Sequence, residues 1–417
     1  MPSTAIINAS QILTLAGPAR PRVGWEMREL GIIDKGALLI ENGRVAKVGP
    51  TEEISNSFTK ETQIIDAGGR LILPGFVDAH THLVFAGNRL DEYEQRLSGT
   101  SYQEIAAAGG GIKKTVALTR AATEEELLTQ AKKHSNWFLS SGTTTIEAKS
   151  GYGLSLESEL KILKVIKRVN DETPLKCVPT FLGAHAFPPE FADDHHGYVR
   201  LIIEEILPAV TEQGLAEFCD AFCEKGYFTV EQCFEIMNRA HALGLGLRLH
   251  ADQLSSSGGA NLAAEMGAVT ADHLEHTDDY GIAALRAARV QPVLLPGSVY
   301  ALGLSKYPDA KRMVDESLAV VLATDFNPGS SPTTSMPMIL SLACTQMQLL
   351  PAEAVVAATI NAAYSLKRGH EIGSLEPGKA ADFVIFDCED YREIPYYFGK
   401  PSVWKTFVAG EYCFSTS

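Results

Sequence analysis

Apolar and polar positions follow two different patterns along this 417-residue chain. Between residues 73 and 376, short apolar runs alternate with segments that carry helix signals, a pattern typical of a parallel sheet covered by helices. Eight of these runs are the near-continuous apolar stretches expected of strands buried on both faces: 76–84, 143–148, 175–183, 215–222, 245–250, 267–273, 288–295 and 317–325. Eight strands alternating with helices predict an α/β fold, a closed (β/α)8 TIM barrel.

Capping boxes mark two of the intervening helices. Thr123 with Glu126 opens the first, and Thr229 with Gln232 opens a second that ends at Gly244. A Thr followed three residues later by Glu or Gln satisfies two backbone N–H groups at a helix start, so both positions predict helix N-termini.

The first 72 residues have the shorter period of antiparallel β-structure. Two apolar-rich runs flank Asn42-Gly43, which is the strongest short hairpin signal. The segment IIDAGGRLILPG predicts another strand pair that ends before Pro74-Gly75.

The C-terminal end returns to this β pattern. Runs at 381–387 and 403–414 predict strands, the second turning near Ala409-Gly410. We therefore expect the two chain ends to pair into one small β-sandwich domain beside the barrel, with boundaries 1–72 and 377–417 for the small domain and 73–376 for the barrel.

Composition limits the classes of partner. The formal net charge of −15 repels nucleic acid and anionic membrane surfaces, so a small-molecule substrate is favoured. The seven cysteines are scattered without a Cys-x-x-Cys framework, which indicates a reducing compartment. Neither a signal peptide nor an apolar stretch of membrane-spanning length is present in the sequence, so we expect a cytoplasmic protein.

The most specific local feature is His80-Thr81-His82 at the end of the first barrel strand. Residues two apart on a strand point to one face, so both imidazoles aim the same way, with Asp78 two positions earlier. Taken alone, two histidines packed in a barrel mouth explain this pattern at least as well as a metal site does.

Three other strand ends change that balance. His250, His273 and Asp325 close the fifth, sixth and eighth expected strands. Barrel enzymes place their active groups at the C-terminal ends of strands, and imidazole with carboxylate suits zinc or iron with room for a water. The set predicts a metal-dependent hydrolase.

These residues lie in segments that resemble a known family. The stretches LPGFVDAHTHL and SLEPGKAADFVIFD are similar to the amidohydrolase superfamily. Within it, further stretches across most of residues 70–390 resemble the imidazolonepropionase family: GNRLDEY, GTSYQEIAAAGGGI, KSGYGL, FLGAHA, HADQLSSSGG, ADHLEHT and DFNPGSSPT. That family converts 4-imidazolone-5-propanoate and water into N-formimidoyl-L-glutamate in histidine degradation, and carries a small β domain beside its barrel.

The resemblance implies a role for each matching residue. One zinc or iron ion per subunit would be bound by His80, His82, His250 and Asp325. Substrate or product would be contacted by Arg89, Tyr102, Tyr152, His185, Gln253, Asn327, Gly329 and Ser330. The catalytic groups would be Asp325, His273, His185 and Gln253.

Two positions depart from the family pattern. Some relatives have Glu where this chain has Gln253, and an amide has no accessible proton chemistry, which argues against a general base there. Ser330 replaces a Thr and keeps the hydroxyl. We expect Asp325 to move the proton from water, and His273 and His185 to donate hydrogen bonds to the oxyanion or ring.

Two lysines also follow expected strands. Lys149 and Lys225 lie where related two-metal enzymes use a modified lysine. We expect each to be a surface or ion-paired lysine instead, and His195-His196 to lie in an exposed polar loop.

Two alternatives stay open at this point. The first is another amidohydrolase, such as a purine-type deaminase or a cyclic ureide hydrolase, since shared ligands do not exclude it. The second is a metal-bound binding protein without catalysis, which is disfavoured because ligands and proton-transfer candidates occur together. The family resemblance also implies a homodimer.

Overall fold

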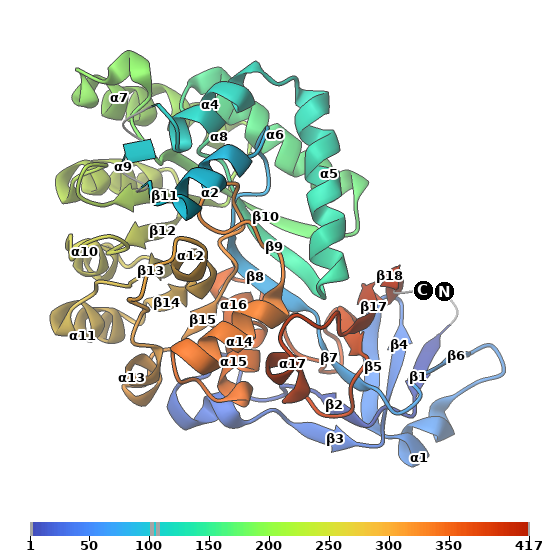
Figure 1. Ribbon diagram of the computed structural model, residues 1–417. Helices are drawn as coiled ribbons and strands as arrows, with labels where there is room; N and C mark the ends of the chain where they lie inside the picture. Colours follow the sequence, from blue (N-terminus) through green and yellow to red (C-terminus); the bar gives the residue numbers. More distant parts are fainter. Residues whose placement is uncertain (1–2, 101–103, 106–108, 416–417) are drawn as a thin grey trace.

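An eight-stranded parallel barrel forms the centre of the computed structural model, which describes residues 3–100, 104–105 and 109–415 (Figure 1). Neighbouring strands pair in chain order from β8 to β15. The strands are β8 (Phe76–Thr81), β9 (Thr143–Lys149), β10 (Lys176–Ala184), β11 (Phe218–Cys223), β12 (Gly246–Ala251), β13 (Thr270–His273), β14 (Gln291–Leu294) and β15 (Val321–Leu322). All eight expected strands and the TIM-barrel prediction are confirmed.

Closure of the barrel depends on the residues that follow the short strand β15. Asp325 N donates to His80 O at 3.1 Å, and His82 N donates to Phe326 O at 2.8 Å. Below them, the Asp78 carboxylate accepts the Thr324 N–H at 3.0 Å and its hydroxyl at 2.6 Å. Backbone and side-chain hydrogen bonds thus hold the first and last strands together where the candidate site residues His80, His82 and Asp325 lie.

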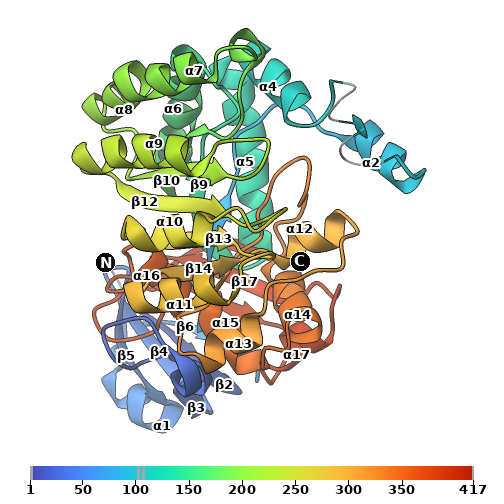
Figure 2. The ribbon, with the colours of Figure 1, turned by 90° about the vertical axis from the view of Figure 1, so that its left-hand side faces the viewer.

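Helices surround the barrel on its outer side (Figures 1 and 2). Both predicted capping boxes are present, at Thr123 and Thr229. The barrel helices are α2 (Leu90–Leu97), α4 (Ile112–Ala121), α5 (Glu124–Ser140), α6 (Leu156–Glu172), α7 (His195–Leu201), α8 (Leu207–Glu212), α9 (Val230–Ala242), α10 (Gly259–Glu265), α11 (Asp279–Ala288), α12 (Pro296–Ala301), α13 (Ala310–Asp315), α14 (Met336–Gln346), α15 (Pro351–Ala357) and α16 (Ile360–Ser365). A π-helical segment, Ile202–Ile206, joins α7 to α8.

The two chain ends form two further sheets beside the barrel (Figure 1). Apolar side chains of both sheets, among them Ile6, Ile40, Phe383 and Phe407, share one core, as the sandwich prediction requires. One sheet has the order β5-β4-β1-β6 and the other β18-β17-β16-β7-β2-β3. Their strands are β1 (Thr4–Ile7), β2 (Gln11–Leu13), β3 (Ile32–Asp34), β4 (Gly36–Glu41), β5 (Arg44–Pro50), β6 (Gln63–Asp66), β7 (Leu71–Pro74), β16 (Phe383–Phe386), β17 (Val403–Val408) and β18 (Glu411–Ser415), with short helices α1 (Thr51–Ile54) and α17 (Glu393–Tyr396).

Turn chemistry explains the hairpins at both ends. Asn42 and Gly43 have φ values of 51° and 73°, and Ala409 and Gly410 have 49° and 75°. Two successive positive φ values match the twist of a two-residue hairpin, so both predicted turns are confirmed. The expected domain boundaries stay a prediction.

Two local expectations were wrong. The strands β6 and β7 do not pair with each other: β6 pairs with β1 and β7 with β16, because the chain crosses between sheets at Gly68-Gly69, both at positive φ. His195 and His196 are exposed but open helix α7, since the Asp194 side chain caps its start.

Candidate active site

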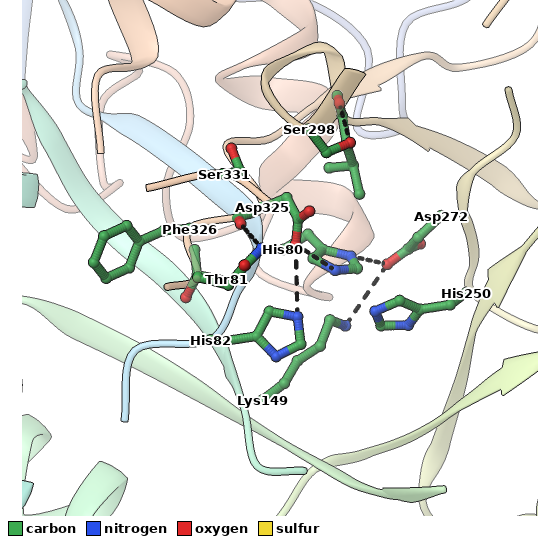
Figure 3. A network of polar contacts seen from close by, with 12 residues as sticks. His80, Thr81, His82, Lys149, His250, Asp272, Ser298, Asp325, Phe326 and Ser331 are labelled. Atoms are coloured by element: carbon green, nitrogen blue, oxygen red, sulfur yellow. Dashed lines mark hydrogen bonds and ion pairs between the residues drawn. The ribbon is translucent and has the colours of Figure 1, made fainter. Parts of the chain in front are cut away.

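Three histidines and one aspartate meet in the mouth of the barrel (Figure 3). The Nε2 atoms of His80 and His82 each lie 3.6 Å from Asp325 Oδ1. One nitrogen each of His80, His82 and His250 lie within 4.8 Å of one another. All four side chains are buried. The four residues expected as ligands therefore converge on one point.

The donor set fits a transition metal. Nε2 of His80 and Nε2 of His250 are buried and have no hydrogen-bond partner among the described residues. Two ligand atoms of a tetrahedral zinc site, each about 2.0–2.1 Å from the ion, are about 3.3 Å apart. The 3.6 Å separations between Asp325 and the two imidazoles are close to that spacing.

Carboxylates behind the histidines fix their orientation. His80 Nδ1 lies 2.6 Å from Asp272 Oδ2, and His250 Nδ1 lies 2.9 Å from Asp220 Oδ2. A carboxylate beside Nδ1 favours a proton on that nitrogen and leaves the Nε2 lone pair for a metal, the usual support of zinc-bound histidine.

A buried lysine compensates these carboxylates. Lys149 Nζ donates to Glu147 Oε1 and to Asp220 Oδ2, each at 2.7 Å. It also lies 3.7 Å from Asp272 Oδ2, the contact drawn in Figure 3. Arg248 is equally buried and lies 3.6 Å from Asp272 Oδ2. Lys149 is thus ion-paired as expected, and its ammonium is occupied by protein carboxylates rather than presented to the cavity.

Burial changes the pKa values of the side chains in this cluster. It raises the pKa of Asp325 to about 7. Burial, followed by the charge of Lys149, holds the pKa of His80 well below its usual range, and burial with the neighbouring His185 does the same for His82. The imidazoles are accordingly neutral, which is the form that binds a metal.

His273 approaches the same point from β13. One of its nitrogens lies within 4.8 Å of ligand atoms of His80 and Asp325. Its Nδ1 lies 3.5 Å from Glu275 Oε1. Both His273 and Asp325 have left-handed backbone, with φ of 81° and 55°, a conformation uncommon outside glycine that recurs at active sites.

A cavity of about 510 Å³ opens above this cluster. Its wall includes His82, His250, His273 and Asp325 together with the candidate substrate contacts Arg89, Tyr152, His185, Gln253, Asn327 and Ser330. Arg96, Thr100, Ile112, Phe222, Tyr227, Leu254, Leu302 and Leu304 complete it. Tyr102 lies outside the described residues.

Arg89 is held at the edge of the cavity rather than loose in a loop. It is 7% exposed, and its Nε donates to Thr115 Oγ1 at 2.9 Å. Gly329 packs against the guanidinium so closely that an added Cβ would lie 2.2 Å from Arg89 Nη1. Gly329 does not line the cavity; its carbonyl accepts from Arg96 Nη1 at 3.0 Å.

His185 has a defined tautomer. Its Nδ1 lies 3.0 Å from Gly151 O, which only accepts, so Nδ1 carries the proton. Burial, followed by the charge of His250, lowers the pKa of His185 to about 3, so the ring is neutral and Nε2 offers a lone pair. The ring stacks on His82 with centroids 5.1 Å apart, and Tyr152 lies 5.3 Å from it.

The loop after β15 is organised by Asn327. Its amide nitrogen donates to Asp325 O and Ser330 Oγ, and its amide oxygen accepts from Gly329 N and Ser330 N, all at 2.7–2.9 Å. Asn327 therefore shapes a turn while also lining the cavity. Gln253 borders the cavity with no hydrogen bond among the described residues.

Sequence comparison places the chain among known proteins. The pattern of the amidohydrolase family matches residues 71–413. The chain belongs to this family. An imidazolonepropionase of Solibacter usitatus is 57% identical over 411 residues, covering 99% of this chain and 98% of the relative. One of Geobacillus kaustophilus is 50% identical over 395 residues, covering 94% and 93%.

Several solved structures share the fold. Guanine deaminase of E. coli superposes with a TM-score of 0.73 at 18% identity, covering 100% of this chain and 99% of that one. A 5-methylcytosine deaminase of Klebsiella pneumoniae gives 0.74 at 18%, covering 99% and 98%. At this identity the likeness concerns the fold alone. No helix in the described part of this chain is long and apolar enough to cross a membrane.

Several site residues of this amidohydrolase were missed by sequence reasoning. Asp220 and Asp272 lie within fully buried strands, and a charged residue in such a strand is itself a signal, because burying it needs a partner. Arg96 follows Arg89 by seven residues, two helical turns, so helical periodicity could have found it.

Proposed function

We propose that this chain hydrolyses the lactam of 4-imidazolone-5-propanoate to N-formimidoyl-L-glutamate, a step of L-histidine degradation. The observation that carries the proposal is a converged His80, His82, His250 and Asp325 cluster at the base of a cavity bordered by Arg89. Relatives named imidazolonepropionase, 45–57% identical over nearly the whole chain, support it.

His80, His82, His250 and Asp325 would hold one zinc or iron ion, and the unpartnered imidazole nitrogens support this assignment. When bound, a divalent metal polarises the lactam carbonyl and lowers the pKa of water to about 7. Lys149 supports a single metal, because its ammonium is committed to Glu147 and Asp220.

Proton transfer is assigned to Asp325. The attacking water loses a proton to the Asp325 carboxylate, and its oxygen bonds to the carbonyl carbon. Burial lowers the pKa of His273, but neighbouring carboxylates, Glu275 foremost, outweigh it and raise that pKa, which favours a proton on both ring nitrogens and lets Nε2 donate a hydrogen bond to the oxyanion. The carbon–nitrogen bond then breaks, and Asp325 returns the proton to the departing ring nitrogen. Water thus supplies both the new carboxylate oxygen and the new N–H.

Substrate orientation is assigned to the cavity wall. Arg89 would bind the propanoate carboxylate through two parallel N–H groups. We assign His185 as an acceptor for a ring N–H, rather than the donor expected from sequence, because its Nδ1 proton is used by Gly151. Tyr152 would pack beside the ring. Gln253 would offer its amide, and Ser330 its hydroxyl.

One assay tests the function against the two alternatives. Purified protein incubated with imidazolonepropionate should remove the ring's ultraviolet absorbance and release one equivalent of N-formimidoyl-L-glutamate. Guanine and 5-methylcytosine should release no ammonia under the same conditions. A protein that deaminates either base, or that binds imidazolonepropionate without turnover, contradicts the proposal.

Assembly, location and metal content belong to the same proposal. We assign a cytoplasmic homodimer with one metal per chain; the seven unpaired cysteines support a reducing compartment. Light scattering should give twice the chain mass of 45.0 kDa, and dialysed protein should retain about one equivalent of zinc or iron. A monomer, or two equivalents of metal, contradicts the corresponding part.

A further inference from the structure

Glu275 is a buried carboxylate without an ordinary partner. It is 4% exposed, and neither of its oxygens has a hydrogen-bond partner among the described residues. His273 lies within ion-pair distance, with its Nδ1 3.5 Å from Glu275 Oε1. Burying a carboxylate without a hydrogen-bond partner or counter-ion costs free energy, so the contact with His273 is the one that has to offset this cost.

A strained turn brings the two side chains together. His273 and Leu274 have φ values of 81° and 70°, two consecutive left-handed residues other than glycine. The turn is fixed on both sides, since Leu274 N donates to Ala251 O at 3.0 Å and His276 N donates to Asp252 O at 2.8 Å. Strain of this kind persists only where the surrounding structure maintains it, and it is found preferentially at functional sites.

The Glu275 side chain lines a cavity instead of packing entirely against other protein atoms. A second cavity of about 190 Å³ is lined by Glu275, Ser298 and Lys306, and it shares Gln253, Leu302 and Leu304 with the large cavity. Lys306 does not reach the carboxylate in an ion pair; its Nζ lies 3.3 Å from His276 Nδ1. Water in this second cavity can hydrate the outer side of Glu275 and leave the inner side to His273.

The contact selects one orientation of the His273 ring. An imidazole that flips by 180° exchanges Nδ1 with Cδ2, so the flipped ring would present a carbon to Glu275. With Nδ1 toward Glu275, the ring's other nitrogen, Nε2, is left for the large cavity, which His273 also lines. A carboxylate beside Nδ1 is a general device for fixing a functional imidazole.

We propose that Glu275 is a positioning residue that holds His273 by Nδ1 and thereby aims Nε2 at the carbonyl oxygen of the substrate. The inference rests on the proposed lactam hydrolysis for its reaction, but the ring orientation itself does not depend on turnover.

The test compares two substitutions of Glu275. In Glu275→Gln an amide oxygen can still accept from Nδ1, whereas Glu275→Met has similar size and no acceptor of that kind. We expect kcat to fall about 10-fold in the first and about 100-fold in the second, because the attraction between the carboxylate and His273 Nδ1 is weakened and then lost. KM should stay within about twofold, and metal content should be unchanged.

A double-mutant cycle separates positioning from a structural role. In a His273→Asn background, Glu275→Met should change kcat by less than about twofold, since the imidazole it positions is gone. The control is Glu353→Met, which removes a buried carboxylate that binds Arg28 far from the cavity and should lower the melting temperature without changing kcat. Equal losses of kcat in both His273 backgrounds would overturn the proposal.

A spectroscopic measurement keeps the inference separate from the proposed function. An imidazole N–H resonance that the Glu275 carboxylate protects from solvent exchange, and that disappears in His273→Asn, should be present in the wild type and absent in Glu275→Met, with or without substrate. Persistence of that resonance in Glu275→Met overturns the positioning role. Failure of the wild type to turn over imidazolonepropionate, with this resonance behaving as expected, overturns the proposed function alone.

Discussion

The base and the rim of the cavity differ in how their residues are held. The base, formed by His80, His82, His250 and Asp325, lies on or shortly after barrel strands, and two of its histidines, His80 and His250, are backed by carboxylates that contact a buried lysine. The rim, formed by Arg89, Arg96, Gln253, Asn327 and Ser330, lies on connections beyond strand ends and relies on single side-chain or loop-internal bonds.

This difference indicates that the base of the cavity carries out the reaction and the rim selects the substrate. A guanine deaminase and a 5-methylcytosine deaminase have the same fold, with TM-scores of 0.73 and 0.74, so the barrel fold alone does not choose the substrate. Connections above the strands vary without disturbing the packed barrel. We therefore expect substitutions in the base to affect turnover or folding most, and those in the rim to affect substrate binding.

The largest effect is expected for Asp325→Asn. Its amide keeps the size of the side chain but cannot accept the proton from water, so kcat should fall about 10²–10⁴-fold while the circular dichroism spectrum is unchanged. Metal analysis should find the ion retained in Asp325→Asn and lost in His80→Ala. Turnover of Asp325→Asn close to that of the wild type would assign proton transfer to another group.

Lys149→Met tests the support under the base. Removing this cation takes the ammonium away from Asp220 and leaves Arg248 as the remaining strong cation beside Glu147 and Asp272, which should lower the free energy of unfolding by about 3–5 kcal/mol. Lys132→Met is the matched control, since Lys132 pairs with Glu172 on the surface and should change stability by less than about 1 kcal/mol. Equal denaturation midpoints for the two variants would contradict the assigned role.

The base was more predictable from sequence than its surroundings. His80 and His82 share a face because strand geometry is periodic, and His250 and Asp325 end recognisable apolar runs. The partners Asp220 and Asp272 depend on which strands become neighbours, which a single strand's pattern does not encode. The pairing of β6 and β7 was wrong for the same reason, because two glycines carry the chain into another sheet.

We expect substitutions in the rim to weaken substrate binding, and Arg89→Ala is the main test of this expectation. Losing charge-assisted hydrogen bonds worth about 1.5–3 kcal/mol should reduce kcat/KM for imidazolonepropionate about 10- to 150-fold. An analogue without the carboxylate should be used equally by both enzymes. Arg200→Ala, at an exposed arginine away from the cavity, is the control. Unchanged discrimination between acid and neutral analogue in Arg89→Ala would place the carboxylate elsewhere.

His134 connects helix α5 to the chain just beyond His82. Its Nδ1 lies 3.0 Å from Leu83 O, and burial lowers its pKa to about 4. Because the unfolded chain binds this proton near pH 6.5, the contribution of His134 to the free energy of unfolding is complete above that pH and declines as the pH falls toward 4, by about 2 kcal/mol at pH 5.

Urea unfolding at pH 7.5 and 5 tests this role of His134. The difference in unfolding free energy between the two pH values should be smaller for His134→Gln than for the wild type, whereas exposed His241→Gln should match the wild type. An unaltered difference in His134→Gln would remove His134 from the acid response.

Gly329→Ala should have the smallest effect and separates the position of Arg89 from its charge. The added Cβ would lie 2.2 Å from Arg89 Nη1, so the guanidinium has to move, while the backbone of Gly329 is acceptable to alanine. A displaced guanidinium keeps its charge but loses one of its two aligned hydrogen bonds, a loss of about 1 kcal/mol, or about fivefold in KM. Since Asp325 is untouched, kcat should stay within about twofold. Gly49→Ala is the control for a glycine, because Gly49 has no left-handed backbone, meets only the Ile54 side chain and lies in β5 of the small sheets. A fall in kcat without a rise in KM would mean that the loop after β15 acts on the base of the cavity, and the separation between base and rim would fail at Gly329.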